Sequence, residues 1–218
     1  YSGGELISVY HTYVKTPTDY GLQALALHNA DDMKGMLQIL PLLSYYDLIN
    51  ELPRPKKVQA NYYLDMDGNK HQELIMKLNL PAPLPRSLSG TAEGCYFKGE
   101  GMEASLRVPL YEEEMKYFYS NYKNYYYLPE EDTAIHKSVA SYVDKAHRVQ
   151  ATAKNCYTRK LSSYLPQWDI LFQPFFKRKY EDRDIFFELT EEMKKERTLF
   201  SKYAGHVINM IAGSYTQG

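Results

Sequence analysis

The feature that most constrains the fold is a change in hydrophobic period at the segment NELPRPKKVQ, residues 50–59. Before it, apolar residues recur every three or four positions, which indicates helices over 5–14 and from 22 to about 48, with an interruption near Asn29. After it, apolar and polar residues alternate, which is typical of half-buried strands. We therefore place a domain boundary between residues 1–52 and 53–218. The second helix is expected to bury one apolar stripe: Met33, Met36, Leu37, Leu40 and Leu43.

The second region has several antiparallel strand signals. Segments 58–64 and 74–80 flank the turn sequence DMDGNK and predict a hairpin. A second hairpin is expected around Gly99 and Gly101, and further strands near 153–161 and on both sides of 175–189. A short helix is predicted from Pro129 and a long final helix after Thr190. The predicted fold class is α+β: N-terminal helices, then an antiparallel β-rich domain with a short middle helix and a long C-terminal helix.

Composition limits the function classes. The 218 residues carry a formal charge of −1, so any contact with nucleic acid requires a local patch or a bound cation. Two cysteines are too few for a disulfide framework, which favours a reducing, cytoplasmic setting. No apolar run reaches the roughly 20 residues that cross a bilayer, so we expect no membrane partner.

One motif within the helical region carries chemistry. In LHNADDMKGM, residues 27–36, His28 and Asp32 are four positions apart and lie on one face of a continuous helix. A carboxylate there suits Mg²⁺ or Mn²⁺, and an imidazole suits proton transfer from water. The alternative is that Asp31 and Asp32 are solvated acids at a helix start, of which Asp31 is the better candidate for that role.

The context of this motif resembles a known family. The run LALHNADDMKGMLQILPLL, preceded by YVKTPTDYG, resembles the last motif of the RNase H-like 3′–5′ exonuclease superfamily, in particular bacterial ribonuclease H-like domain proteins. The segments YKNYYYLPEEDTAIHKSVASYVDK and NCYTRK resemble the C-terminal region of one such family. The resemblance implies that Asp32 is a ligand of Mg²⁺ or Mn²⁺ and that His28 orients the attacking water.

The other acids of that superfamily have no counterpart here. Its Asp-x-Glu strand does not occur in the 27 residues before His28, and Asp184 and Glu188 in DRDIFFEL have the wrong spacing. Two-metal hydrolysis needs several acids around ions about 4 Å apart. With no initiator methionine at Tyr1, we expect the C-terminal part of a longer nuclease, inactive alone. Its partners would be the N-terminal half of the same chain and DNA or RNA.

A non-catalytic alternative remains open. The 22 tyrosines, bunched in KYFYSNYKNYYYLP, favour either packing between layers or stacking on bases, so the β-rich region is alternatively a module that binds nucleic acid or protein. In FFKRKYEDR, the cations Lys177, Arg178 and Lys179 lie among aromatic residues; they form either a weak nucleic-acid surface or a solvated strand edge. Asp132 and His136 repeat the four-residue spacing, and a helix N-terminus is the favoured explanation.

Overall fold

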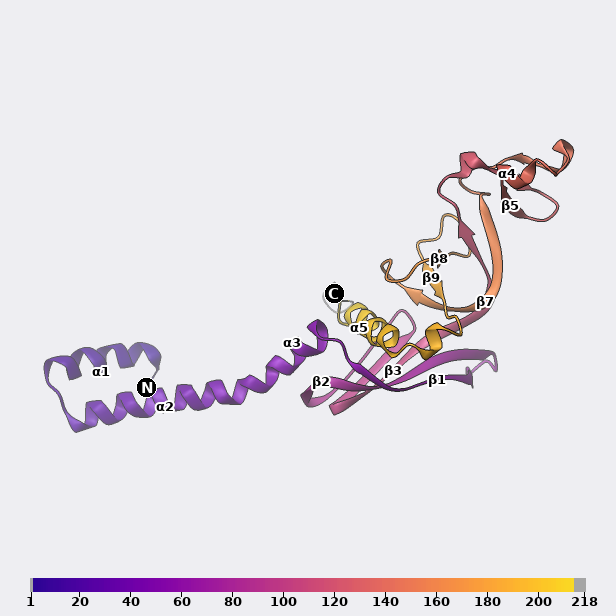
Figure 1. The fold of residues 1–218 in the computed structure, drawn as a ribbon. Helices are drawn as coiled ribbons and strands as arrows, with labels where there is room; N and C mark the ends of the chain where they lie inside the picture. Colours follow the sequence, from indigo (N-terminus) through magenta and orange to yellow (C-terminus); the bar gives the residue numbers. More distant parts are fainter. Residues whose placement is uncertain (1, 214–218) are drawn as a thin grey trace.

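The structure is a computed structural model that describes residues 2–213. It consists of a helical arm, a long six-stranded antiparallel sheet on which the C-terminal helix and the last helix of the arm pack, and a small three-stranded sheet at the far end (Figure 1). The predicted α+β class is confirmed. No helix in residues 2–213 is long and apolar enough to cross a membrane.

The helical arm contains α1 (Gly3–Lys15), α2 (Asp19–Ile39), the 3₁₀ turn η1 (Leu40–Leu42) and α3 (Leu43–Asn50). The Thr18 hydroxyl starts α2 by accepting a hydrogen bond from the Gly21 amide at 3.1 Å. The interruption predicted near Asn29 is wrong, because α2 runs through that residue without a break. Asn and Asp disfavour a helix interior only by tenths of a kcal/mol to about 0.7 kcal/mol, which neighbouring residues outweigh.

The buried stripe predicted for α2 is also wrong. The side chains of Met33, Met36, Leu37, Leu40 and Leu43 are all exposed. Gly21 is the buried residue of α2 and Leu6 that of α1, because the arm extends away from the sheet and the two helices contact mainly each other (Figure 1). The helical period predicts which face is apolar, but burial requires a surface to pack against.

The large sheet has the strand order β1-β2-β3-β7-β9-β8. The hairpin predicted around DMDGNK is confirmed, with Leu64 opposite Lys70. Its turn is held by the Asp65 carboxylate, which accepts from the backbone amides of Asp67 and Asn69 at 2.9 and 2.8 Å. The strands are β1 (Arg54–Leu64), β2 (Lys70–Ala92), β3 (Cys95–Phe118), β7 (Tyr157–Gln167), β8 (Phe175–Phe176) and β9 (Ile185–Glu188).

The second hairpin turns at a different place from the one predicted. Its two-residue turn is Glu93–Gly94, with φ of 49° and 75°, and Gly99 and Gly101 lie inside β3. Two successive positive φ values match the twist of antiparallel strands, and Gly tolerates the second one freely. Gly101, with φ of 54°, instead lies where the β2–β3 register is irregular.

The core lies between this sheet and the final helix, α5 (Arg197–Gly213). Thr190 does not cap α5; its hydroxyl accepts from the Met193 amide at 3.3 Å in the preceding turn, η4 (Met193–Lys195). The sequence predicts that Met193, Phe200, Tyr203, Val207 and Ile211 form the apolar face of the last helix. The last four are buried in α5, whereas Met193 lies in η4 and is only partly buried. These side chains pack on alternate residues of β2 and β3: Leu74, Met76, Leu78, Leu80, Ala104, Leu106, Val108 and Leu110.

The small sheet occupies the middle of the chain, where the sequence predicts a helix. The helix predicted from Pro129 is a turn between β4 (Tyr125–Leu128) and β5 (Thr133–His136), with β6 (Val149–Gln150) on the other side of β4. Acids after a proline favour a helix start, but pairing of tyrosine-rich β4 with β5 prevails here. The short helix α4 follows at Lys137–Ala140, and single turns η2 and η3 lie at Tyr122–Asn124 and Lys145–His147.

Candidate functional site

His28 and Asp32 lie on one face of α2, as their spacing predicts. The imidazole Nε2 is 3.3 Å from a carboxylate oxygen of Asp32, and the two side chains are 38% and 62% exposed. On the same face, one and two turns further along, lie the exposed side chains of Met36 and Ile39. The pair is therefore an exposed polar contact that borders an apolar helix surface.

Asp31 occupies a different environment from Asp32. Its carboxylate lies 3.4 Å from the Lys34 ammonium group, and with His28 it lines a shallow hollow of about 340 Å³ along α2. Both acids are in the interior of the helix, so the alternative that they begin a helix is wrong. The Asp31 side chain is exposed to solvent, as the alternative predicts, but it does not cap a helix.

The described residues do not form a metal site by themselves. Within residues 2–213, no group of three or more His, Cys, Asp or Glu side chains is close enough together to hold an ion. In this part of the chain, His28 and Asp32 have no third such side chain beside them. Two ions held about 4 Å apart would therefore need carboxylates from another segment or subunit.

The basic run after β8 does not form one continuous patch. The Arg178 guanidinium forms an ion pair with Glu113 at 2.7 Å and lies over the rings of Tyr111 and Phe186. Lys177 points elsewhere: its ammonium group donates to the backbone oxygen of Asp182 at 2.8 Å. Lys179 is exposed. Alternation along an extended segment separates Arg178 from Lys177, so the three cations do not share one face.

Lys177 instead joins an aromatic hollow that the linear sequence does not reveal. The hollow has a volume of about 480 Å³ and lies between the end of β3, η2 and the segment after β8. Its aromatic lining comes from three separated segments: Phe118, Tyr119, Tyr122, Phe175 and Tyr180. The bunched tyrosines in the sequence indicate the part of the lining that contains Tyr119 and Tyr122. The contribution of Phe175 and Tyr180 depends on the topology of the sheet.

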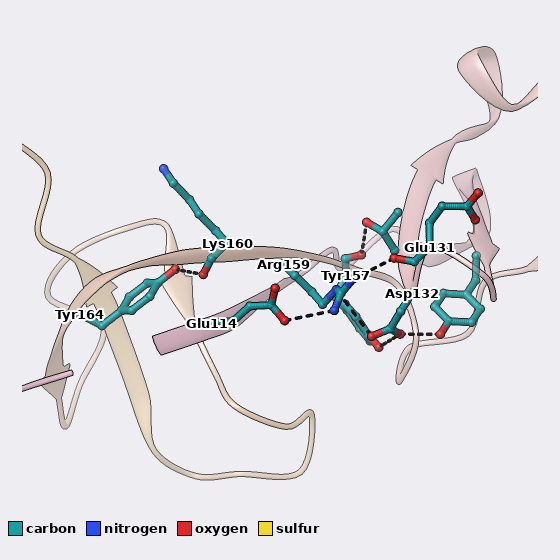
Figure 2. Close-up of polar contacts among 9 residues, drawn as sticks. Glu114, Glu131, Asp132, Tyr157, Arg159, Lys160 and Tyr164 are labelled. Atoms are coloured by element: carbon teal, nitrogen blue, oxygen red, sulfur yellow. Dashed lines mark hydrogen bonds and ion pairs between the residues drawn. The ribbon is translucent and has the colours of Figure 1, made fainter. Parts of the chain in front are cut away.

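A polar cluster around Asp132 joins the small sheet to the large one (Figure 2). The hydroxyls of Tyr127 and Tyr157 both donate to one oxygen of the Asp132 carboxylate, the first at 2.5 Å. The Arg159 Nε lies 3.6 Å from the other oxygen, and the same guanidinium donates to the backbone oxygen of Glu131 at 3.0 Å. We name Asp132, Tyr127, Tyr157 and Arg159 the Asp132 cluster.

The pKa shifts in the Asp132 cluster follow from these hydrogen bonds. Desolvation alone would raise the pKa of Asp132, but the two tyrosine hydroxyls and Arg159 bring it below its ordinary value. The hydrogen bond to Asp132 raises the pKa of Tyr127 far above 10, and burial together with Asp132 raises that of Tyr157. The cluster therefore holds a carboxylate and two neutral phenols.

The Asp132 cluster corrects the interpretation of Asp132 and His136. Asp132 has φ of 48° in the β4–β5 turn and does not begin a helix. His136 is exposed, and its ring accepts from the Ser138 amide at 3.3 Å as the cap of α4. The four-residue spacing of Asp132 and His136 therefore reflects a strand rather than one face of a helix.

Comparison with models of protein families, with curated proteins and with solved structures gave no match for this chain.

Proposed function

We propose that residues 1–52 are the closing helices of an RNase H-like 3′–5′ exonuclease domain that hydrolyses phosphodiester bonds in DNA or RNA with Mg²⁺ or Mn²⁺. Asp32 would supply one oxygen ligand of the ion, and His28 would orient the attacking water. The observation that carries the proposal is the placement of this pair beside an unpartnered apolar face of α2.

The apolar face supports a partner surface. Leu37 is 66% exposed, Met36 59% and Met33 54%, in a 21-residue helix whose buried residue is Gly21. Contiguous exposed apolar side chains mark sites where another protein surface packs. The occupant we propose is the remainder of the RNase H-like domain.

The same surface would bring the other acids to Asp32. Met36 and Ile39 continue the face that carries His28 and Asp32, so a surface packed on them lies directly beside the pair. Carboxylates on that surface would complete the ligand set that residues 2–213 lack. By this proposal the 218-residue chain is inactive alone.

The test is cleavage of end-labelled single-stranded DNA and RNA by the full natural protein with Mn²⁺. We expect Asp32→Asn to abolish cleavage and His28→Ala to slow it by about 100- to 10,000-fold, since His28 would act in proton transfer. The matched control is Asp31→Asn, which removes a neighbouring charge of the same type and should leave the rate unchanged.

Two results would contradict the proposal. One is wild-type cleavage by Asp32→Asn. The other is cleavage by residues 1–218 alone that Asp32→Ala abolishes, because a chain with a single acid at the site would then be a complete catalyst.

A second function, binding of nucleic acid without catalysis by the tyrosine-rich region, is favoured by the aromatic hollow. Aromatic rings beside a cation suit stacking of bases near a phosphate. Titration of the chain with single-stranded oligonucleotides at two salt concentrations tests this function separately from cleavage.

A further inference from the structure

The aromatic hollow is built from segments that the fold brings together from distant positions. Phe118 ends β3 and Tyr119 follows it, Tyr122 belongs to η2, and Phe175 and Tyr180 come from β8 and the segment after it. Its volume of about 480 Å³ lies within the range of sites for small ligands, about 300–1,000 Å³. It is therefore large enough for one or two planar rings.

The walls of the hollow are fixed by packing outside it. The Tyr119 ring stacks on Tyr125 at 4.5 Å between centroids, and Phe118 contacts the rings of Tyr157 and Tyr180 edge-on at 5.3 and 5.4 Å. Tyr157 is held in turn by Asp132. Rings that are already held lose little further freedom when a ligand stacks on them.

The segment after β8 is held as well. Lys116 of β3 and Lys177 exchange two backbone hydrogen bonds, at 2.8 and 2.9 Å. The Lys177 ammonium group also donates to the backbone oxygens of Asp182 and Tyr180, at 2.8 and 3.4 Å. The hollow is thus formed before any ligand enters.

The charge on the lining of the hollow favours an anionic ligand. Within residues 2–213 Lys177 makes no ion pair, so carbonyl oxygens orient its charge without neutralising it. The residues that line the hollow include no carboxylate. Lys123 and Lys179 are exposed and directly adjoin the lining residues Tyr122 and Tyr180.

We propose that this hollow binds an unpaired base of a single-stranded nucleic acid, with Lys177 beside the adjoining phosphate. Aromatic walls offer faces on which any base stacks, and only an unpaired base has both faces free. This proposal rests on the second function above, nucleic-acid binding by the tyrosine-rich region, and requires no nuclease activity.

The test is fluorescence anisotropy of labelled oligothymidylate and oligouridylate of about 15 nucleotides with residues 1–218, a length that spans a typical binding site. EDTA is present, so binding is measured whether or not the protein can cleave. We expect Tyr180→Ala to weaken binding about 5- to 100-fold, which is the effect of losing one stacked base, while Tyr180→Phe binds like the wild type.

Two further variants make the experiment specific. Tyr142→Ala is the matched control, because Tyr142 is 91% exposed and does not line the hollow; it should bind within about twofold of the wild type. Lys177→Gln keeps a donor for the carbonyl oxygens and should lower the slope of log Kd against log salt by about one unit, measured from about 50 to 200 mM.

The binding of these variants distinguishes a specific site from non-specific binding. Weaker binding by Tyr180→Ala, with Tyr142→Ala unaffected, supports the site for DNA or RNA according to which oligonucleotide binds. Unchanged binding by Tyr180→Ala, equal loss in Tyr142→Ala, or preference for a duplex overturns it. Binding lost here while Asp32-dependent cleavage persists would remove this site and leave the nuclease proposal standing.

Discussion

The Asp132 cluster gives the sharpest prediction about this protein. Asp132→Ala removes the acceptor of two tyrosine hydroxyls, of which that of Tyr157 belongs to a buried residue. A buried donor left without an acceptor costs about 1–3 kcal/mol. The side chain of Asp132 is 38% exposed, so water partly replaces it and the lower half of that range applies.

The backbone adds to the cost of this substitution. Asp132 has φ of 48°, which Asp and Asn tolerate and Ala disfavours by about 1–2 kcal/mol. We therefore expect Asp132→Ala to lower the free energy of unfolding by about 2–4 kcal/mol. Asp132→Asn keeps an acceptor and the backbone preference but loses the charge, and should cost about 1–2 kcal/mol.

Urea denaturation followed by circular dichroism measures both variants. Glu131→Ala is the control, because the Glu131 side chain is exposed and only its backbone oxygen contacts Arg159; it should stay within about 0.5 kcal/mol of the wild type. A loss below about 1 kcal/mol for Asp132→Ala, or one equal to that of Glu131→Ala, would refute the reasoning.

The same cluster predicts a pH range of action. The pKa of Asp132 is lowered on folding, so its contribution is lost as pH falls below about 4. The pKa values of Tyr127 and Tyr157 are raised, so their contribution is present below pH about 10 and is lost as pH rises through the folded-state values. In Asp132→Ala, absorbance titration should show both phenols ionising at lower pH than in the wild type.

Three further predictions concern the core and the arm. Tyr203→Phe removes the hydrogen bond from a fully buried hydroxyl to the backbone oxygen of Pro166, 2.9 Å away. It should lower the free energy of unfolding by about 1–2 kcal/mol, measured by urea denaturation, and an unchanged midpoint would contradict this. Burial lowers the pKa of His206, whose Nε2 accepts from the Trp168 amide, so the free energy of unfolding should decline as pH falls below about 6.5. His206→Gln should reduce that decline, measured as urea midpoints across this pH range; an identical pH dependence in the variant would count against it. Leu37→Gln should leave the unfolding free energy within about 0.5 kcal/mol, because Leu37 is already exposed; a larger loss would mean that α2 is packed in this chain itself.

Features with short-range causes could be predicted from the sequence. The turn around DMDGNK depends on Asp65 binding backbone amides two and four residues ahead, and this is encoded locally. The apolar face of α5 follows from its own period. The turn at Glu93–Gly94 also had a local signal in Gly94, but Gly99 and Gly101 offered competing ones.

The candidate sites show the same distinction between short-range and long-range causes. The spacing of His28 and Asp32 correctly predicts that they share a face, because both lie within one helix. The fold separates Lys177 from Arg178, because Arg178 pairs with Glu113 whereas Lys177 donates to the backbone oxygen of Asp182. Contact of Lys177, Arg178 and Lys179 with nucleic acid stays a prediction. The helix expected from Pro129 fails because β4 pairs with β5, and Asp132 in the turn between them binds Tyr157, 25 residues away.

The sequence by itself determined the α+β class, the change from helices to strands near residue 52, the first hairpin, the final helix and the shared face of His28 and Asp32. Each depends on a period or on hydrogen bonds within a few residues. Only the tertiary structure decided that the apolar face of α2 lies open, that the Asp132 cluster joins the two sheets, and that Phe118, Tyr119 and Tyr180 form one hollow. These features arise from contacts between segments distant in the chain, whose pairing local patterns do not encode.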